Sequence, residues 1–275
     1  MSLSKKIGVI GTGRVGTTIG YNLKKSGHQI IGAADLKQKN VRQFCQILKL
    51  KYRKLSNVDI ANKANLIFIT TQDAAVEKVY CQILPYLKKG TVLVQCSGAL
   101  SNTIFKKARK KRIIVIGLHP IQTFATIRQS IKATKNIYYA VEAEPKARPI
   151  ARKLVAALHG NPVYITSKDK PLYHAMCVFA SNYLVSLMSA VLDIALALKI
   201  RPNLAFTMLE PLIKQTLDNI QKDGIEKSLT GPIMRGDIET IKSHLKILEK
   251  KLPHLLPLYQ TLGLKALSLL ITKSA

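Results

Sequence analysis

Acidic residues are scarce in this sequence, and its few cysteines form no recognisable pattern. There are 15 Asp and Glu against 43 Lys and Arg, which gives a formal net charge of +28. Cys45, Cys81, Cys96 and Cys177 lack CxxC spacing, so the sequence predicts neither a metal site nor a disulfide framework. The first 13 residues leave no room for a signal peptide with a separate apolar region. We therefore expect a cytoplasmic protein.

The positive charge is concentrated in the first half of the chain. Residues 1–150 hold 27 Lys and Arg against 6 acidic residues, whereas residues 151–275 hold 16 against 9. The densest run is FKKARKKR at 105–112, which could contact phosphates or form the solvated face of a helix. No zinc-finger spacing or mixed basic and aromatic motif accompanies it. Nucleic-acid binding is therefore not the expected main function, and a non-catalytic basic nucleotide- or nucleic-acid-binding protein is the alternative to an enzyme.

One apolar run, 176–198, approaches the length that spans a bilayer. It contains Asn182, Asp193 and three serines, and basic residues flank both ends. A central Asp costs roughly 2.5 to 3.5 kcal/mol on the membrane-insertion scale. The run therefore predicts a buried helix of a soluble domain, without a membrane partner.

Strand and helix patterns alternate through the first 166 residues. Apolar runs typical of strands covered on both faces occur at 6–10, 29–34, 66–71, 91–96 and 113–117. Helical patterns separate them at about 14–26, 38–49, 73–87 and 100–111, and further strands are predicted at 137–143 and 162–166. The alternation predicts an α/β fold with a doubly wound, mostly parallel Rossmann sheet.

The rest of the chain is predicted to be helical. Helices are expected from about 171 to 198 and at 203–222, 238–250 and 254–271, with Asp237 as the N-cap of the third. The sequence thus predicts a dinucleotide-binding domain at 1–167 and an all-helical domain at 168–275. We expect the helical domain to complete a substrate site and to form a homodimer.

Residues 11–16 match the pattern GxGxxG, directly after a predicted strand and at the start of a predicted helix. In that context Gly11 allows a tight turn, Gly13 lets the backbone approach a pyrophosphate, and Gly16 lets the helix pack on the strand. The helix N-terminus adds unpaired N–H groups and partial positive charge. Six residues are therefore predicted to contact a dinucleotide: Gly11, Thr12, Gly13, Arg14, Val15 and Gly16.

Two residues near the end of the second strand bear on the choice between NAD and NADP. Asp35 lies where an acidic side chain would accept hydrogen bonds from the adenosine 2′-hydroxyl, which favours NAD. Lys37 and Lys39 favour a 2′-phosphate, and Asp35 could also point out of the site. The sequence leaves both cofactors open.

Polar residues cluster where three later strands are predicted to end. In an open parallel sheet the ligand lies beyond the carboxyl ends of the strands, so these residues are candidates for binding cofactor and substrate. Each has a structural alternative, as a helix cap, a turn former or a partner of a backbone carbonyl. They are Thr71, Gln72 and Asp73; Ser97 and Gly98; and His119, Pro120 and Gln122.

The helix that begins near residue 170 carries polar side chains in two stripes. At about 100° per residue, Lys170, His174, Cys177 and Ser181 share one narrow stripe, and Asn182 begins a second with Ser186, Ser189 and Asp193. A reductase needs a proton donor beside the carbonyl oxygen, and Lys170 and His174 could supply it, with Asn182 orienting the substrate. The angle between the stripes makes Asn182 the weakest member of this set.

A loop between two helices, LTGPIMRGD at 229–237, contains Arg235. Its guanidinium could hold a substrate carboxylate with two hydrogen bonds. A loop that only ends one helix and caps the next would explain the same residues.

Five motifs in order, GTGRVG, SGALS, LHPIQTF, YHAMCVFASN and LTGPIMRGD, resemble a family of Rossmann-like oxidoreductases whose helical C-terminal domain was catalogued as a domain of unknown function. The resemblance covers essentially the whole chain. The family is related to the superfamily of pyrroline-5-carboxylate reductase, 6-phosphogluconate dehydrogenase and ketopantoate reductase, and some members are described as alternative ketopantoate reductases. It implies NADPH-dependent reduction of 2-dehydropantoate in pantothenate biosynthesis, with another oxo acid or a cyclic imine as the alternative substrate.

The resemblance also implies roles for particular residues. It places residues 11–16 at the cofactor, and Ser97, His119, His174 and Asn182 around the substrate. Ketopantoate reductases have a catalytic Lys at the start of the equivalent helix and an Asn four residues later; Lys170 matches, but His174 takes the place of that Asn. Family members commonly carry a basic or small polar residue where this chain has Asp35, so the preference for NADPH stays open.

Overall fold

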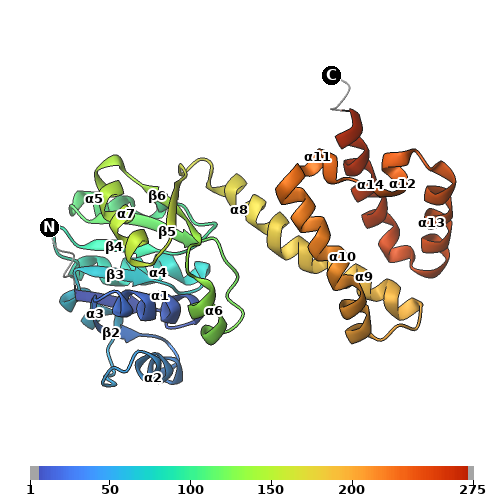
Figure 1. Ribbon diagram of the computed structural model, residues 1–275. Coiled ribbons are helices and arrows are strands. Elements are labelled where there is room, and N and C mark those ends of the chain that lie inside the picture. The colour runs from blue at the N-terminus through green and yellow to red at the C-terminus, as the bar shows by residue number, and fades with distance from the viewer. Residues whose placement is uncertain (1–5, 272–275) are drawn as a thin grey trace. The chain divides into compact units, whose positions relative to one another are not determined.

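The computed structural model describes residues 6–271 and divides into two compact units, Met1–Ser181 and Asn182–Ala275 (Figure 1). Residues 1–5, on which the expected absence of a signal peptide partly depends, and residues 272–275 lie outside the described residues. The side chain of Arg109, in the basic run 105–112, does too.

The first unit contains a seven-stranded sheet in the order β2-β1-β3-β4-β5-β6-β7. All neighbouring strands are parallel except β5 and β6, which are antiparallel. The predicted fold class, a mostly parallel doubly wound sheet followed by helices, is confirmed. The strands are β1 Lys6–Ile10, β2 Gln29–Ala34, β3 Leu66–Ile69, β4 Val92–Gln95, β5 Ile114–Pro120, β6 Tyr138–Ala143 and β7 Asn161–Tyr164.

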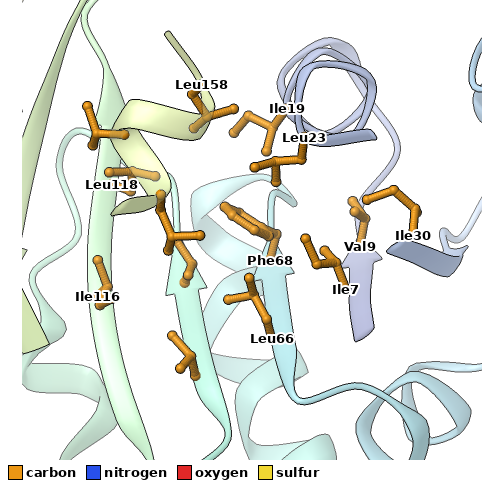
Figure 2. Close-up of a cluster of buried hydrophobic side chains, with 14 of the residues drawn as sticks. Ile7, Val9, Ile19, Leu23, Ile30, Leu66, Phe68, Ile116, Leu118 and Leu158 are labelled. Carbon is orange, nitrogen blue, oxygen red and sulfur yellow. The ribbon is translucent and has the colours of Figure 1, made fainter. Parts of the chain in front are cut away.

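Helices cover both faces of this sheet, because the strands are apolar on both sides. On one face Ile19 and Leu23 of α1 lie over Val9 and Phe68 of the sheet (Figure 2). On the other face Tyr80 and Phe105 pack edge to face, with ring centroids 4.7 Å apart. Helices α1 Arg14–Lys25, α2 Gln38–Ile47 and α7 Arg148–Ala157 belong to the first face, and α3 Asn57–Lys63, α4 Asp73–Ile83 and α5 Lys106–Lys110 to the second.

Two short helices and one strand extension differ from the sequence prediction. Helix α3 and helix α6, Ile127–Ala133, were not predicted, because seven residues carry little periodic signal. Helix α3 is fixed by a capping box in which Ser56 and Asp59 bond each other's backbone N–H groups. Strand β5 continues to Pro120 because it pairs with β6, so His119 lies opposite Ala140 within the strand and not beyond its end.

The second unit is helical. Asp237 caps α13 as predicted, since its carboxylate accepts hydrogen bonds from the backbone N–H and the hydroxyl of Thr240. Its α-helices are α9 Leu184–Ala197, α10 Pro202–Asp223, α11 Ile225–Ser228, α12 Gly231–Arg235, α13 Ile238–Lys251 and α14 Leu256–Ile271. The single-turn 3₁₀ helices of the chain are Leu84–Tyr86, Asn102–Phe105, Pro145–Ala147 and Pro253–Leu255.

The long apolar helix crosses the boundary between the units. It consists of α8 Lys170–Val178, a π-helical turn Phe179–Tyr183, and α9. The contact boundary after Ser181 lies later than the predicted one at 167, because buried Lys170 and Tyr173 hold the start of α8 against the sheet. The π turn adds a residue per turn, so the angular count that separated Asn182 from Ser181 does not apply across it.

This helix is exposed in the single chain, contrary to the prediction that it is buried. Over 170–197 it is long and apolar enough to cross a membrane, with a mean hydropathy of 1.7, and only 6% of that window is buried. Leu172 is 77% exposed and Phe179 is 70% exposed. Apolar composition indicates that a surface is buried against other atoms, but it does not indicate whether the same chain or another molecule provides them. The prediction of a helix buried within the chain was wrong for this reason.

Candidate active site

The glycine loop has the local geometry that its sequence predicts. Gly11 has a φ of +95°, and a Cβ there would lie 2.7 Å from the backbone of Thr70 and Thr71. A Cβ on Gly16 would lie 2.1 Å from the carbonyl oxygen of Gly11. Gly11 is therefore required by the turn, and Gly16 by the packing of α1 against the loop.

The same loop leaves space at the start of α1. A Cβ on Gly13 would meet no atom within 4 Å. Because the N-cap residue is this glycine, no N-cap side chain bonds the first N–H groups of α1. The first turn of α1 contains no acidic residue. At the end of β3, the buried hydroxyl of Thr71 has no hydrogen-bond partner in the described part of the chain. Free helix N–H groups, open space and an unpaired hydroxyl fit the diphosphate of a dinucleotide cofactor.

Asp35 braces the glycine loop. Its Oδ2 accepts hydrogen bonds from the backbone N–H of Thr12, at 2.7 Å, and from the Thr12 hydroxyl, at 3.0 Å. Its Oδ1 accepts from the backbone N–H of Lys37 and the side-chain amide of Asn40. A carboxylate offers about four acceptor positions, so these four contacts occupy its capacity. The Asp35 side chain therefore points at the glycine loop and does not face away from it.

Ser97 connects the ends of β3 and β4. Its hydroxyl donates to Asp73 Oδ2 at 2.7 Å and accepts from the backbone N–H groups of Ala99 and Leu100. Ser97 is 8% exposed. The turn-forming role, which the sequence offered as the alternative to ligand contact, accounts for both acceptor contacts, while the bond to Asp73 ties this turn to the start of α4.

Two imidazoles meet at Gly98. A Cβ on Gly98 would lie 2.7 Å from Cδ2 of His174 and 2.9 Å from Nε2 of His119, so both rings pack against this glycine. The other ring nitrogen of His119, Nδ1, lies 2.5 Å from the hydroxyl of Tyr173. The structure thus brings together three predicted site residues from separate elements: the turn after β4, strand β5 and helix α8.

His119 and the neighbouring Tyr173 both have shifted pKa values. Burial, followed by the nearby positive charge of Lys170, lowers the pKa of His119 to about 4. The imidazole is therefore neutral at physiological pH. Burial raises the pKa of Tyr173 well above its usual range, so its hydroxyl stays protonated.

Lys170 is buried and paired with an acid, and its catalytic role stays a prediction. Its side chain is 1% exposed, and Nζ lies 3.2 Å from Oε2 of Glu142, which is 5% exposed. A Cβ on Gly117 would lie 3.2 Å from Nζ, so the ammonium group lies over the backbone of β5. Burial lowers the pKa of Lys170, and the carboxylate of Glu142 opposes that effect. The predicted stripe thus separates into a buried Lys170 and a partly exposed His174.

Glu142 is one of two residues of this region that the sequence prediction missed. Its Oε1 accepts hydrogen bonds from the Ser101 hydroxyl, the Asn102 backbone N–H and the Ser167 hydroxyl, at 2.6 to 3.0 Å. A carboxylate within the apolar strand YYAVEA was the available signal, because a buried acid needs a partner. Tyr173 was also missed, since an aromatic residue in an apolar helix is typical of a core.

Several predicted site residues lie elsewhere or use their side chains differently. Gln122 donates to the Ala133 carbonyl oxygen and accepts from the Thr123 backbone, so its amide serves the loop before α6. Arg14 donates to the Phe124 carbonyl oxygen at 3.1 Å. Val15 packs against the core, and Gln72 and Lys37 are exposed N-cap residues of α4 and α2. Ser181 ends the first unit, while Asn182 and Arg235 are exposed residues of the second, so their site roles stay predictions.

Two reactive possibilities are limited by the surroundings. Among the described residues, no group of three or more His, Cys, Asp or Glu is placed to hold a metal ion. Burial raises the pKa of the Cys96 thiol to about 12, so this residue, beside Ser97, stays protonated.

Two family models match parts of the chain. Residues 6–98 match the model described as NADP oxidoreductase, coenzyme F420-dependent. Residues 137–266 match the model described as a domain of unknown function, DUF2520, so the match begins one residue before strand β6 and includes part of the first unit. No curated protein matches the chain.

The fold is shared with solved oxidoreductases. A Bacteroides fragilis protein provisionally described as an NADP oxidoreductase is 19% identical, with a TM-score of 0.79 over 96% of this chain and 98% of that one. An imine reductase from Myxococcus stipitatus in complex with NADP⁺ is 14% identical, with a TM-score of 0.71 over 97% and 94%. Pyrroline carboxylate reductase from Plasmodium falciparum, with NADP bound, is 15% identical, with a TM-score of 0.62 over 96% and 98%. At these identities the likeness shows the fold. The chain thus joins a segment that matches an NADP oxidoreductase family to one that matches a domain of unknown function.

Proposed function

We propose that this protein is an NADP-dependent oxidoreductase that reduces a small 2-oxo acid, with 2-dehydropantoate as the first candidate substrate. The supporting observation is a continuous series of contacts along the carboxyl ends of the strands. Gly11 contacts the backbone at Thr70 and Thr71, Ser97 bonds Asp73, and Gly98 contacts both imidazoles. A cofactor at the glycine loop would therefore extend toward the two histidines, as the position of ligands in open α/β sheets requires.

The occupied acceptor positions of Asp35 favour NADP over NAD in this proposal. A carboxylate already bonded to Thr12, Lys37 and Asn40 has no acceptor left for the ribose 2′-hydroxyl. Lys37 and Lys39 are exposed beside it and could neutralise a 2′-phosphate. The description of the family that matches residues 6–98 names the same cofactor.

His119 is the proposed hydrogen-bond donor to the substrate. A neutral imidazole carries one proton, and we propose that the Tyr173 hydroxyl donates to Nδ1, which would place that proton on Nε2, at Gly98. Nε2–H can then stabilise the charge that develops on a carbonyl oxygen while the bound cofactor supplies hydride. His174, partly exposed at the same glycine, completes the polar wall.

Imine reduction is the second candidate, and the state of Lys170 favours it. A 2-oxo acid needs a cation for its carboxylate, but the ammonium group of Lys170 is buried and paired with Glu142. Among its described residues, the first unit therefore offers His119 and His174 without a free permanent cation beside them, whereas an imine without a carboxylate needs only polar donors. That Arg235 holds a substrate carboxylate stays a prediction from the sequence.

We also propose that a second copy of the chain covers the exposed apolar helix. Asp193 lies within its hydropathic stretch and contacts His254, with Oδ2 and Nε2 3.5 Å apart and both side chains partly exposed. An Asp at this surface suits a protein partner better than lipid, where Asp costs roughly 2.5 to 3.5 kcal/mol. Size-exclusion chromatography with light scattering tests this: a detergent-free dimer supports it, and a monomer that binds lipid vesicles contradicts it.

The proposed activity is tested by measuring the oxidation of NADPH, which is monitored as a loss of NADPH absorbance. Wild-type protein is assayed with 2-dehydropantoate and with 1-pyrroline, a cyclic imine without a carboxylate, and NADH replaces NADPH in parallel. Faster oxidation with 2-dehydropantoate supports the first candidate, and faster oxidation with the imine supports the second. If neither substrate is reduced, and His119→Asn binds NADPH as wild type does, the proposed reductase function is wrong for both substrates.

A further inference from the structure

Helices α1 and α6 of the first unit lie side by side and run in the same direction. Arg14 at the start of α1 bonds the carbonyl of Phe124, just before α6, and Asn22 near the end of α1 bonds the hydroxyl of Thr134, just after α6. A cavity of about 760 Å³ opens beside the final turns of both helices. Lys25, on its wall, is separated from Gly13 by the length of α1, roughly 18 Å.

The walls of this cavity, here called the α1–α6 groove, are strongly basic. Lys25, Arg128, Lys132 and Lys135 line it, and none of its lining residues that the structure describes is acidic. All four of these cations are exposed. On α6, Arg128, Ile131 and Lys132 have the spacing i, i+3, i+4, so they share one face of the helix, and Lys135 follows two residues after its end.

Helix dipoles explain only part of this charge. Lys25 and Lys132 lie in the last turns of α1 and α6, where cations are favourable, but Arg128 lies in the first turn of α6. Helices α1, α6 and α7 end here, and each C-terminus carries about −0.5 charge. Their sum is well below the charge of four cations, so the groove stays positive.

Apolar side chains form the rest of the wall. Tyr21, Ile131 and Leu158 contribute carbon surface, and Tyr21 supplies an aromatic ring. The volume lies within the range of about 300 to 1,000 Å³ that is typical of small-molecule sites. A nucleic acid that bound specifically would instead cover about 1,000 to 2,500 Å² of protein surface.

We propose that the α1–α6 groove binds a small polyanion with an aromatic part, of the chemical class of nucleoside polyphosphates. Its phosphates bond Arg128, Lys132 and Lys25, and its aromatic part packs against Tyr21 and Ile131. This site is separate from the glycine loop, so it binds its ligand while the cofactor is present.

Calorimetric titration with ATP, in the presence of saturating NADP⁺, tests the proposal on the full chain. Arg128→Gln/Lys132→Gln removes two groove cations, and Lys107→Gln/Lys110→Gln removes two exposed cations from α5 as the matched control. Loss of two charge-assisted contacts weakens ATP binding at least about tenfold in the groove variant. The control stays within about twofold of wild type. Inorganic tripolyphosphate binds more weakly than ATP because it lacks the aromatic part.

Three results would overturn the inference. One is no ATP binding to wild type with NADP⁺ present. Another is an equal loss of affinity in both double variants, which indicates diffuse surface charge. The third is groove-dependent binding of a short RNA duplex without ATP binding. Urea unfolding checks that the groove variant folds, and the single variant Lys132→Gln replaces it if it does not.

Discussion

The ammonium nitrogen of Lys170 lies 3.2 Å from Oε2 of Glu142, and both side chains are almost completely buried. The same carboxylate bonds Ser101 and Asn102 after β4 and Ser167 before α8. The buried carboxylate of Glu142 therefore holds the turn after β4, the residues before α8 and, through Lys170, the start of α8. We therefore expect Glu142 and Lys170 to act as positioning residues for His119 and His174.

Glu142→Gln should destabilise the protein strongly. The substitution leaves the Lys170 ammonium buried without a counter-charge, which costs about 3 to 5 kcal/mol of unfolding free energy. Urea unfolding measures the change. The matched substitution Glu239→Gln removes an exposed ion pair with Lys242 and should cost less than about 1 kcal/mol. Adding Lys170→Met to Glu142→Gln should recover stability, and a double variant no more stable than Glu142→Gln would contradict the buried pair as the cause.

Gly13→Ala and Gly16→Ala should separate cofactor binding from folding. Gly13 has a φ of −69° and open space around its Cβ position, so alanine leaves the free protein stable but blocks the approach of a diphosphate. A Cβ on Gly16 meets the Gly11 carbonyl at 2.1 Å, so alanine there lowers the melting temperature. Calorimetry with NADP⁺ should show at least about tenfold weaker binding for Gly13→Ala. Wild-type affinity in Gly13→Ala would place the cofactor elsewhere.

His119 should make stability depend on pH in the acid range. Its folded pKa of about 4 lies below the ordinary value of 6.5, so the unfolded chain takes up the proton first as pH falls. Stability is therefore full above about pH 6.5 and declines toward pH 4, by about 3 kcal/mol at most. Urea unfolding of wild type and His119→Asn at several pH values isolates this effect. A difference between the two proteins that does not change with pH would show that the histidine is not neutral and buried.

Asp35→Ala should weaken NAD and NADP by similar factors, because it removes the contacts that hold Thr12 in the glycine loop. The ratio of the two dissociation constants should stay within roughly tenfold of wild type. Asp35→Asn keeps one acceptor for the loop and should have a smaller effect. Tighter NADP binding together with loss of NAD binding would instead identify Asp35 as the residue that contacts the ribose.

The sequence by itself determined the fold and the glycine loop. Alternating apolar runs and helical patterns in the first 166 residues specify a parallel sheet, because strands covered on both faces must be apolar throughout. The clash of a Cβ on Gly11 with Thr70 and Thr71 comes from residues distant in the sequence. The positive φ of Gly11 and the close approach of Gly16 to the Gly11 carbonyl are, by contrast, local features that the GxGxxG spacing predicts. Asp237 was predictable as a cap for the same reason, since a cap depends on residues within one turn.

Only the tertiary structure decided the burial and the partners of Lys170, Glu142 and His119. Residues 142 and 170 are far apart in sequence, and their contact depends on how α8 packs against the antiparallel pair β5 and β6. Helical spacing placed Lys170 and His174 on one face, but it does not say how deeply each residue of that face is buried. Burial and pairing change a side chain from an exposed cation into a structural support, and both arise from contacts between distant segments.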